Sequence, residues 1–209
     1  MIVDASHGPG SEIGRVTGNL ASVLMAERTA LNFLCHLSGI ATLTRRYVRA
    51  AHGESRIWDT RKTTPGLRAL EKAAVRAGGG RNHRGNLSEW VLLKDNHLAG
   101  IGITEAVKRA RERWPGRTVQ VEADTFEQLE EAIAAAADIV LLDNMTPDEV
   151  ARCVIRRGSS PRPLLEVSGG VNLQNVNDYA GAGVDLISVG AITHSAPVLD
   201  IGLDVKQVD

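Results

Sequence analysis

Short apolar runs alternate with stretches of helical apolar spacing through the second half of the chain. The runs are TVQVEA (118–123), IVLLD (139–143), LLEVS (164–168) and LISVG (186–190). They end 21 to 25 residues apart, which leaves room for one strand, one helix and two short loops in each repeat. This alternation is typical of parallel βα units, so the pattern predicts an α/β fold.

Helix-start signals lie between these runs. Thr125 with Gln128 three residues later predicts a capping box, and Thr146 stands directly before a proline at the first helical position. Asn172 is expected to cap a helix that continues through Val176. Each predicted strand is therefore followed by a helix or by a helix start.

The same unit continues upstream with a weaker pattern. IWDT (57–60) and WVLLKD (90–95) are expected as strands, and helices are expected near 67–77 and 104–114. Six parallel strands, each followed by a helix, suit a closed or nearly closed α/β barrel. A doubly wound open sheet is the alternative, because strand order cannot be read from a sequence.

A long helical stretch precedes the barrel, from about residue 20 to residue 52, with an expected break at Ser38-Gly39. The first 18 residues are rich in Gly and Ser and do not fit the barrel pattern. We expect them to belong to something other than the barrel.

Composition narrows the function. The 24 Lys and Arg against 25 Asp and Glu give a formal net charge of −1, which argues against a nucleic-acid-binding chain. No apolar run is long enough for a membrane helix, and the first residues are too polar for a secretory signal, so we expect a cytoplasmic protein without membrane contact. Cys35 and Cys153 lie far apart and predict two reduced thiols. The three Trp, two Tyr and two Phe predict an aliphatic core.

Candidate chemistry lies directly after the predicted strands, because active sites of parallel α/β folds form at the carboxyl ends of the strands. Cations follow the first strands, carboxylates the middle ones and small residues the last ones. The set is Arg61, Lys62, Lys94, Glu122, Asp143, Ser168, Gly169, Gly170, Gly190 and His194, to which a loop adds His83 and Arg84.

The cations would converge on one barrel mouth, where they need a strongly anionic ligand to offset their repulsion. Each alone would be an ordinary solvated charge. Lys94 ends the apolar run WVLL and would be buried, so it needs a partner; both anion binding and a Schiff-base role are open for it.

Two further groups complete the predicted site. Glu122 and Asp143 end adjacent strands and could share one Mg²⁺, although carboxylates near helix starts are also common without a metal. The glycines after the last two strands, at 168–170 and 190, favour a phosphate site over plain turns. The residues alone thus indicate an enzyme on an α/β barrel that binds an anionic, phosphorylated substrate with Mg²⁺.

Longer motifs carry a family resemblance. They are AERTALNFLCHLSGIAT (26–42), DTRKTTPGLRALEKAAVRAGGG (59–80), NHR (82–84), LLKDNH (92–97), VEAD (121–124), LLDNM (141–145), EVSGGV (166–171) and ISVGAITHSAP (187–197). With these motifs in this order, the chain resembles the quinolinate phosphoribosyltransferases, or carboxylating nicotinate-nucleotide pyrophosphorylases. The resemblance implies transfer of phosphoribose from phosphoribosyl pyrophosphate to quinolinate, with release of nicotinate mononucleotide, pyrophosphate and CO₂, a step of NAD biosynthesis.

The resemblance also implies a role for each candidate residue. Quinolinate would be bound by Arg28, Arg61, His83, Arg84 and Lys94, with Arg28 reaching in from the partner subunit of a homodimer or higher homo-oligomer. Phosphoribosyl pyrophosphate would be bound by Lys62, Ser168, Gly169, Gly170, Gly190 and His194. Lys62, Glu122 and Asp143 would be catalytic, and the two carboxylates would hold Mg²⁺.

The chain departs from the family pattern in two ways. Family members carry several tens of residues before the point where this chain starts, so residues 1–24 and 197–209 are expected to be a remnant of an open β-sandwich domain, and 25–196 a helical linker and the barrel. Gln120 stands where many members have a glutamate. Two alternatives to the carboxylating transferase stay open. One is a non-catalytic phosphosugar-binding fragment, and the other is a molybdenum-associated relative of unknown substrate.

Overall fold

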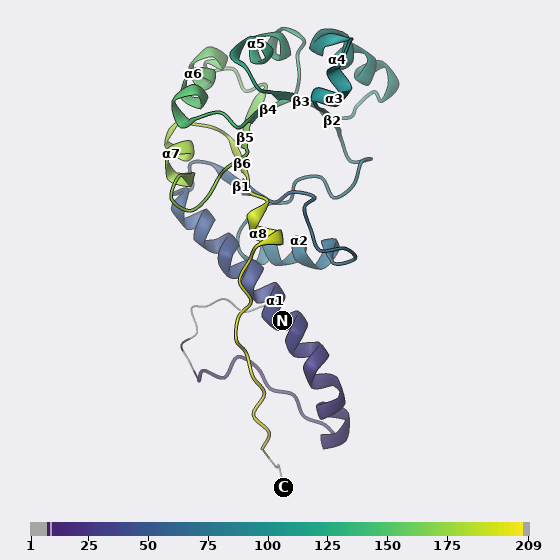
Figure 1. Cartoon of the computed structure of the whole chain (residues 1–209), viewed down its shortest axis with the longest axis vertical. Coiled ribbons are helices and arrows are strands. Elements are labelled where there is room, and N and C mark those ends of the chain that lie inside the picture. Colours follow the sequence, from purple (N-terminus) through teal and green to yellow (C-terminus); the bar gives the residue numbers. More distant parts are fainter. Residues whose placement is uncertain (1–7, 9, 207–209) are drawn as a thin grey trace.

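Six parallel strands curve into an incomplete barrel in the computed structural model, which describes residue 8 and residues 10–206 (Figure 1). The strands are β1 (Arg56–Trp58), β2 (Val91–Leu93), β3 (Val119–Ala123), β4 (Ile139–Asp143), β5 (Leu164–Ser168) and β6 (Leu186–Ser188). Their order in the sheet is β1-β6-β5-β4-β3-β2. From β2 to β6 each strand pairs with its sequence neighbour, and β6 then returns to pair with β1.

This strand order confirms the predicted barrel and excludes the doubly wound sheet, in which the chain would reverse at a switch point in the middle. β1 and β2 are the two edges of the sheet, so the barrel is open at a seam between them. The only isolated bridge among the described residues, between Trp58 and Arg81, continues β1 toward this seam. Arg81 is therefore paired with β1, whereas the residues between Arg81 and β2 lie outside the sheet.

Helices cover the outside of the sheet (Figure 1). They are α2 (Arg68–Ala77), α3 (Asp95–Leu98), α4 (Gly102–Arg113), α5 (Phe126–Ala134), α6 (Pro147–Arg157), α7 (Val176–Gly181) and α8 (Ala191–His194). The predicted capping box of α5 is confirmed, since the Thr125 and Gln128 side chains each accept the other's backbone N–H. α6 begins after Thr146 with its own capping box.

The helix predicted to start after Asn172 begins three residues later than expected, although Asn172 makes hydrogen bonds of the kind that a helix cap makes. The Asn172 side chain accepts the backbone N–H groups of Gln174 and Asn175, at 2.9 and 3.2 Å, and so stabilises a turn. α7 begins only at Val176, because Asn172 satisfies a local turn before the chain enters the helix.

The expected break at Ser38-Gly39 is wrong. α1 (Leu20–Ala50) runs through both residues as one continuous helix of 31 residues, capped by the Asn19 side chain. Gly39 is needed for close approach, since a Cβ there would lie 2.0 Å from the Pro197 carbonyl oxygen. The C-terminal segment follows α1 from this point, and the Leu199 N–H donates to the Cys35 carbonyl at 3.1 Å (Figure 1).

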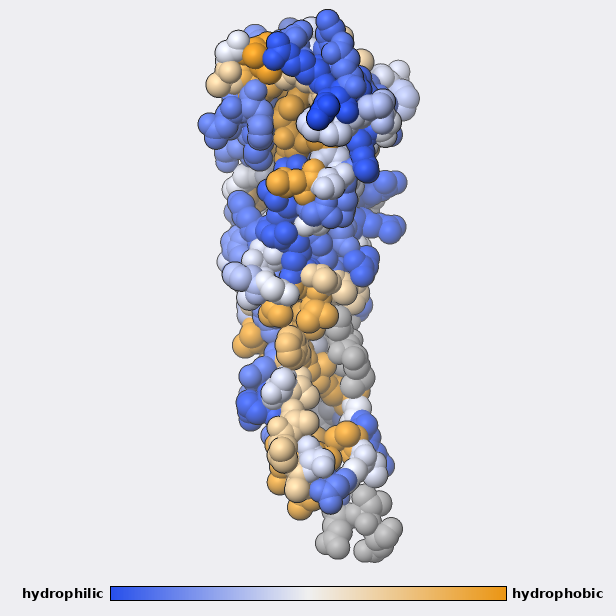
Figure 2. Space-filling view, turned by 90° about the vertical axis from the view of Figure 1, so that its right-hand side faces the viewer, coloured by the Kyte–Doolittle hydropathy of each residue, from blue (hydrophilic) through white to orange (hydrophobic). Residues whose placement is uncertain are grey.

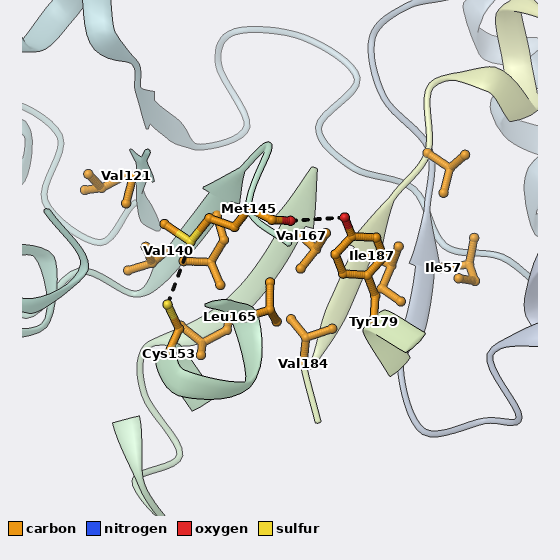
Figure 3. Close-up of a cluster of buried hydrophobic side chains, with 14 of the residues drawn as sticks. Ile57, Val121, Val140, Met145, Cys153, Leu165, Val167, Tyr179, Val184 and Ile187 are labelled. Atoms are coloured by element: carbon orange, nitrogen blue, oxygen red, sulfur yellow. Dashed lines mark hydrogen bonds between the residues drawn. The ribbon is translucent and has the colours of Figure 1, made fainter. Parts of the chain in front are cut away.

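The core is aliphatic, as the composition predicts. Figure 3 shows strand side chains such as Val140, Leu165 and Ile187 packed together, each fully buried. Helices add a few polarisable or hydroxylated groups at its edge: Cys153 contacts the Met145 sulfur at 3.8 Å, and the Tyr179 hydroxyl donates to the Met145 carbonyl at 3.0 Å. Both cysteines are free thiols.

Apolar surface gathers at the end of the molecule away from the barrel. Figure 2 shows this as an orange region in the lower half, below the mostly hydrophilic surface of the barrel. Leu20, Leu24, Met25 and Phe33 of α1 are 42 to 85 % exposed, and Val198 of the C-terminal segment is exposed as well. Contiguous apolar surface of this kind is typical of interaction sites.

Two segments beside α1, residues 10–19 and 195–206, are extended and form no strand in the described part of the chain. The β-sandwich assignment of 1–24 and 197–209 therefore stays a prediction. None of the helices within the described residues has both the length and the apolar character needed to cross a bilayer.

Candidate active site

The predicted residues of the strand ends gather at one barrel mouth. The Lys94 ammonium contacts the Glu122 carboxylate across the β2 and β3 ends. The positive charges of Lys94 and Lys62 both act on Asp143 at the end of β4. Gly190, after β6, lies against the side chains of Lys62 and His194. The side chains that follow β1, β2, β3, β4 and β6 therefore surround one space.

Lys94 is paired rather than isolated. Its side chain is 45 % exposed, while Glu122 is 7 % exposed, so the carboxylate lies below the ammonium group and holds it at the mouth. An ion-paired ammonium is not the free amine that Schiff-base formation requires. The geometry favours anion binding over a Schiff-base role for Lys94.

Arg84 is the cation that most needs a ligand. It is 7 % exposed, and among the described residues no carboxylate lies within ion-pair distance of its guanidinium group. Burial, and then the neighbouring positive charge of Arg61, lowers the pKa of Arg84. A buried charge without a partner is costly. The pair of Arg84 and Arg61 is therefore suited to bind an anion.

His83, next to Arg84, faces the protein interior. Its Nδ1 accepts the Arg84 backbone N–H at 2.9 Å, and its Nε2 lies 3.5 Å from the Glu166 carboxyl group. The ring packs against Trp58 and Trp90, with centroids 5.6 and 4.7 Å away. Burial, and then the positive charges of Arg84 and Lys72, lowers the pKa of His83 to about 3.

His83 is consequently neutral at physiological pH, and since Nδ1 accepts a hydrogen bond, its proton is on Nε2. Any contact with a bound anion would come from a neutral N–H group and not from a cation. The backbone contact to Arg84 shows a second role, which is to orient the loop that carries this arginine.

A buried ion pair holds the same loop from below. The Lys72 ammonium group on α2 donates to Asp59 at 2.5 Å and to the His83 carbonyl at 2.7 Å. Asp59, fully buried at the end of β1, also accepts the His83 backbone N–H at 2.8 Å. Both backbone polar groups of His83 are therefore bound to one ion pair, which positions His83 and Arg84 across the open seam.

A polar network lies inside the barrel beneath the mouth. Gln120 donates to Glu166 at 2.7 Å and accepts from the Trp90 ring N–H at 2.9 Å, while the Ser188 hydroxyl donates to the other Glu166 oxygen. Glu166 is completely buried, and burial raises its pKa to about 7. A carboxyl group in this state changes its protonation near neutral pH.

Sequence reasoning missed Asp59, Lys72 and Glu166. A signal existed for each: Glu166 interrupts the apolar run LLEVS, Asp59 follows IW in the first strand, and Lys72 is on the face of α2 that carries buried Ala and Val residues. Charges at core positions need partners, but the sequence does not show which partners they have.

Glu122 and Asp143 end the paired strands β3 and β4. Burial raises the pKa of Asp143, and the positive charges of Lys94 and Lys62 oppose this shift. No group of three or more metal-binding side chains exists among the described residues. Two carboxylates suit Mg²⁺, which is commonly held by one or two of them together with water and substrate phosphates.

The glycine loop after β5 is held against the loop after β4. Gly169 has φ of 87°, and a Cβ there would lie 2.2 Å from the Asn144 side-chain oxygen. The Asn144 N–H donates to the Ser168 carbonyl at 2.9 Å. Gly170, with φ of 63°, has open space around it. These backbone groups are accessible, as a phosphate cradle requires.

Lys62 and His194 flank the second glycine position. A Cβ at Gly190 would lie 3.1 Å from the His194 ring and 3.2 Å from the Lys62 side chain. The Thr193 hydroxyl donates to the Lys62 carbonyl at 2.7 Å and ties the loop after β1 to α8. The structure thus places a lysine and a histidine beside the glycines predicted to bind phosphate.

Arg28 is not brought to this mouth within one chain. It lies in the N-terminal part of α1, where its side chain is 76 % exposed and its ion pair is with the adjacent Glu27 at 3.8 Å. The donation of Arg28 across a subunit interface stays a prediction.

Comparisons with known proteins agree on one family. The profile described as quinolinate phosphoribosyl transferase, C-terminal domain, matches residues 40–204, and the profile for the N-terminal domain matches residues 5–38. The two matched regions meet within α1.

Relatives of known sequence and structure carry matching names. The nicotinate-nucleotide pyrophosphorylase [carboxylating] of Mycobacterium leprae is 50 % identical over 186 residues, with 88 % of this chain and 66 % of that protein covered. A probable enzyme of the same name from Bacillus subtilis is 48 % identical, covering 94 % of this chain and 68 % of that protein. The solved nicotinate-nucleotide pyrophosphorylase of Francisella tularensis superposes with a TM-score of 0.83 at 44 % identity, covering 88 % and 65 % of the two chains. The chain spans about two thirds of the length of these relatives.

The glycine loop provides a matched pair of variants. Gly169→Ala and Gly170→Ala both place a side chain at positive φ, which costs about 1–2 kcal/mol each. Only Gly169→Ala also forces a Cβ into Asn144, so we expect it to lower the free energy of unfolding by roughly 1–3 kcal/mol more than Gly170→Ala. Urea unfolding measures both, and equal losses would show that the contact with Asn144 does not constrain this loop.

Glu166 predicts a pH-dependent stability. Its pKa is raised in the folded state, so its contribution is present below the unfolded pKa of 4.5 and is lost as pH rises through about 7. Between pH 5 and pH 8 we expect the free energy of unfolding to fall by roughly 2–3 kcal/mol more in the wild type than in Glu166→Gln.

Urea unfolding at the two pH values tests this difference. Glu112→Gln, at an exposed position on α4, is the control and should follow the wild type. A Glu166→Gln variant that loses as much stability as the wild type would show that Glu166 does not titrate in this range.

Proposed function

Since the chain belongs to the quinolinate phosphoribosyltransferase family, we propose that it transfers phosphoribose from phosphoribosyl pyrophosphate to the ring nitrogen of quinolinate. The products would be nicotinate mononucleotide, pyrophosphate and CO₂, a step of NAD biosynthesis. The observation that carries the proposal is Arg84, which is 7 % exposed, has no carboxylate within ion-pair distance among the described residues and lies close enough to Arg61 for their positive charges to interact.

Quinolinate suits this part of the mouth because it carries two adjacent carboxylates. Guanidinium groups bind carboxylates through paired N–H donors, and two of them can each take one carboxylate. Lys94, held at the rim by Glu122, would supply a third positive charge. The neutral His83 would orient Arg84 and offer at most an uncharged N–H to the ligand.

The phosphoribosyl donor suits the opposite part of the mouth. The glycines at 169, 170 and 190, with Ser168, would hold the 5′-phosphate through backbone N–H groups. His194 lies beside this cradle, and Lys62 would extend from it toward the pyrophosphate. The two ligands would then meet near Glu122 and Asp143.

The chemistry begins at the anomeric carbon of the ribose. Its bond to the pyrophosphate oxygen breaks, the electron pair leaves with pyrophosphate, and the quinolinate nitrogen forms the new bond. Positive charge builds on the ribose in this step, and the carboxylates of Glu122 and Asp143 stabilise it, while Lys62 stabilises the leaving group. No covalent bond to the protein is needed.

Decarboxylation follows from the positive charge on the ring. The bond from the ring to the 2-carboxylate breaks, its electrons are stabilised by the pyridinium nitrogen, CO₂ leaves, and the carbon takes up a proton. Mg²⁺, held by Glu122 and Asp143 with phosphate oxygens and water, would supply positive charge to the leaving pyrophosphate.

The assembly is proposed to be a homodimer or higher homo-oligomer. The exposed apolar side chains of α1 and the C-terminal segment supply a surface for it (Figure 2). Arg28, exposed on the same helix, would reach the quinolinate of the neighbouring subunit. Both substrates are small soluble anions, and a cytoplasmic location is part of the proposal.

Product analysis tests the reaction. The folded chain, incubated with quinolinate, phosphoribosyl pyrophosphate and Mg²⁺, should form nicotinate mononucleotide and CO₂, detected by mass spectrometry. A sample without quinolinate is the control. Binding of the phosphoribosyl donor without product would instead favour the non-catalytic phosphosugar-binding alternative.

Arg84→Ala separates the two halves of the mouth. Removing a buried charged partner typically costs at least about 2 kcal/mol of binding, so quinolinate affinity should fall roughly 30-fold or more. Affinity for phosphoribosyl pyrophosphate should change less than about 3-fold, as should both affinities in Arg109→Ala, an exposed control on α4. Calorimetric titration measures them, and equal loss of both ligands in Arg84→Ala would contradict the division of the site.

A further inference from the structure

Two loops carry the two arginines that face quinolinate in the proposed function, Arg61 and Arg84. The first, residues 60–66, follows β1 and holds Arg61 and Lys62; we call it the β1 loop. The second, residues 81–87, holds His83 and Arg84; we call it the seam loop, because it precedes β2 at the open seam of the barrel. Two carboxylates on one small ring can be bound by both loops only if the loops keep a fixed spacing.

One side chain outside the predicted site contacts both loops. Arg68, the first residue of α2, donates from Nε to the Thr63 hydroxyl at 3.0 Å and from Nη2 to the Arg61 carbonyl at 3.2 Å. Its third nitrogen, Nη1, donates to the Gly85 carbonyl in the seam loop at 3.1 Å. Each of the three nitrogens has its own acceptor, two in one loop and one in the other.

The shape of the guanidinium group makes this contact a spacer. Its nitrogens are held in one rigid plane, so the acceptors on the two loops cannot move independently while all three bonds persist. A lysine at the same place would keep the charge, but its single ammonium group would be a point donor on a flexible stem. The contact therefore depends on the planar arrangement of the three guanidinium nitrogens and not on the positive charge.

Regular backbone pairing holds only the start of the seam loop. The Arg81 N–H donates to the Ile57 carbonyl at 2.8 Å and the Asp59 N–H donates to the Arg81 carbonyl at 3.1 Å, but among the described residues no strand pairing holds Arg84. Arg61 and Arg84 also repel each other, because both are positively charged and Arg61 lies close enough to lower the pKa of Arg84. The tethers come from α2, where Arg68 and Lys72 are four residues apart and lie on the same helix face.

The two tethers have different tasks. Lys72 binds Asp59 and the His83 carbonyl, and so attaches the seam loop to the end of β1 in the interior. Arg68 binds neutral oxygens nearer the mouth and attaches the seam loop directly to the residues that present Arg61. Arg68 therefore acts directly on the two loops that carry Arg61 and Arg84.

We infer that Arg68 is a positioning residue that sets the distance between Arg61 and Arg84 and thereby the preference of the mouth for a ligand with two adjacent carboxylates. This inference rests on the proposed function for the identity of the ligand. The tether itself rests only on the three hydrogen bonds, and the two parts can be tested separately.

Hydrogen exchange tests the tether without any ligand. In Arg68→Lys, amides of the β1 loop and of the seam loop should both exchange roughly tenfold faster or more, because the hydrogen bonds of a charged donor are lost in both. Segment 139–143, in the core strand β4, should be unchanged. Faster exchange in only one loop, or in neither, would overturn the tether.

Binding tests the consequence for selectivity. In Arg68→Lys, affinity for quinolinate should fall roughly tenfold or more, whereas affinity for nicotinate, which has one carboxylate, should change less than about threefold. Arg109→Lys, on the exposed face of α4, should leave both affinities unchanged. Equal losses for the two ligands would mean that Arg68 does not set the spacing of Arg61 and Arg84.

Chemical rescue separates positioning from a general loss of structure. Methylguanidinium added to Arg68→Ala should restore a measurable part of the quinolinate affinity, and ethylammonium at the same concentration should not. Rescue by both cations, or by neither, would contradict the role of the planar guanidinium group. A wild-type chain that forms no nicotinate mononucleotide would overturn the proposed function, and the exchange experiment would still decide the tether.

Discussion

The buried ion pair of Asp59 and Lys72 is the interaction on which the site depends. The barrel has a seam between β1 and β2, where backbone pairing with β1 reaches Arg81 and no strand pairing among the described residues holds Arg84. The ion pair extends the attachment beyond Arg81, since it binds both backbone polar groups of His83, the residue before Arg84. Burying two charges is costly, and here the same hydrogen bonds that offset that cost also position the loop.

The electrostatics of the mouth and of the interior are arranged in opposite ways. At the mouth, Arg61 and Arg84 are left without carboxylate partners among the described residues, which lowers stability and prepares the site for anions. Beneath them, burial keeps His83 neutral and raises the pKa of Glu166 to about 7, so Glu166 is only partly ionised near neutral pH. A net charge of −1 over the whole chain thus coexists with a strongly cationic mouth.

Sequence reasoning succeeded where the responsible interactions are local. The strands at 139–143 and 164–168 and the capping boxes at Thr125 and Thr146 depend on residues within a few positions of each other. It failed at Gly39, which lies inside a continuous helix where the Pro197 backbone occupies the space of a side chain, whereas a glycine alone would suggest a break. The candidate strand-end residues were found for the same local reason, because each one directly follows an apolar run.

What the sequence by itself determined is the set of six strands, the helices between them and the chemical types at the strand ends. Only the tertiary structure decided the strand order, the open seam, and the partners of Asp59, Lys72, Glu166 and Arg68. The partners that hydrogen-bond to these side chains are 5 to 46 residues away in the chain. The physical reason is that a charged side chain in a core shows that it needs a partner, while the choice of partner follows from how the packed helices and strands meet in space.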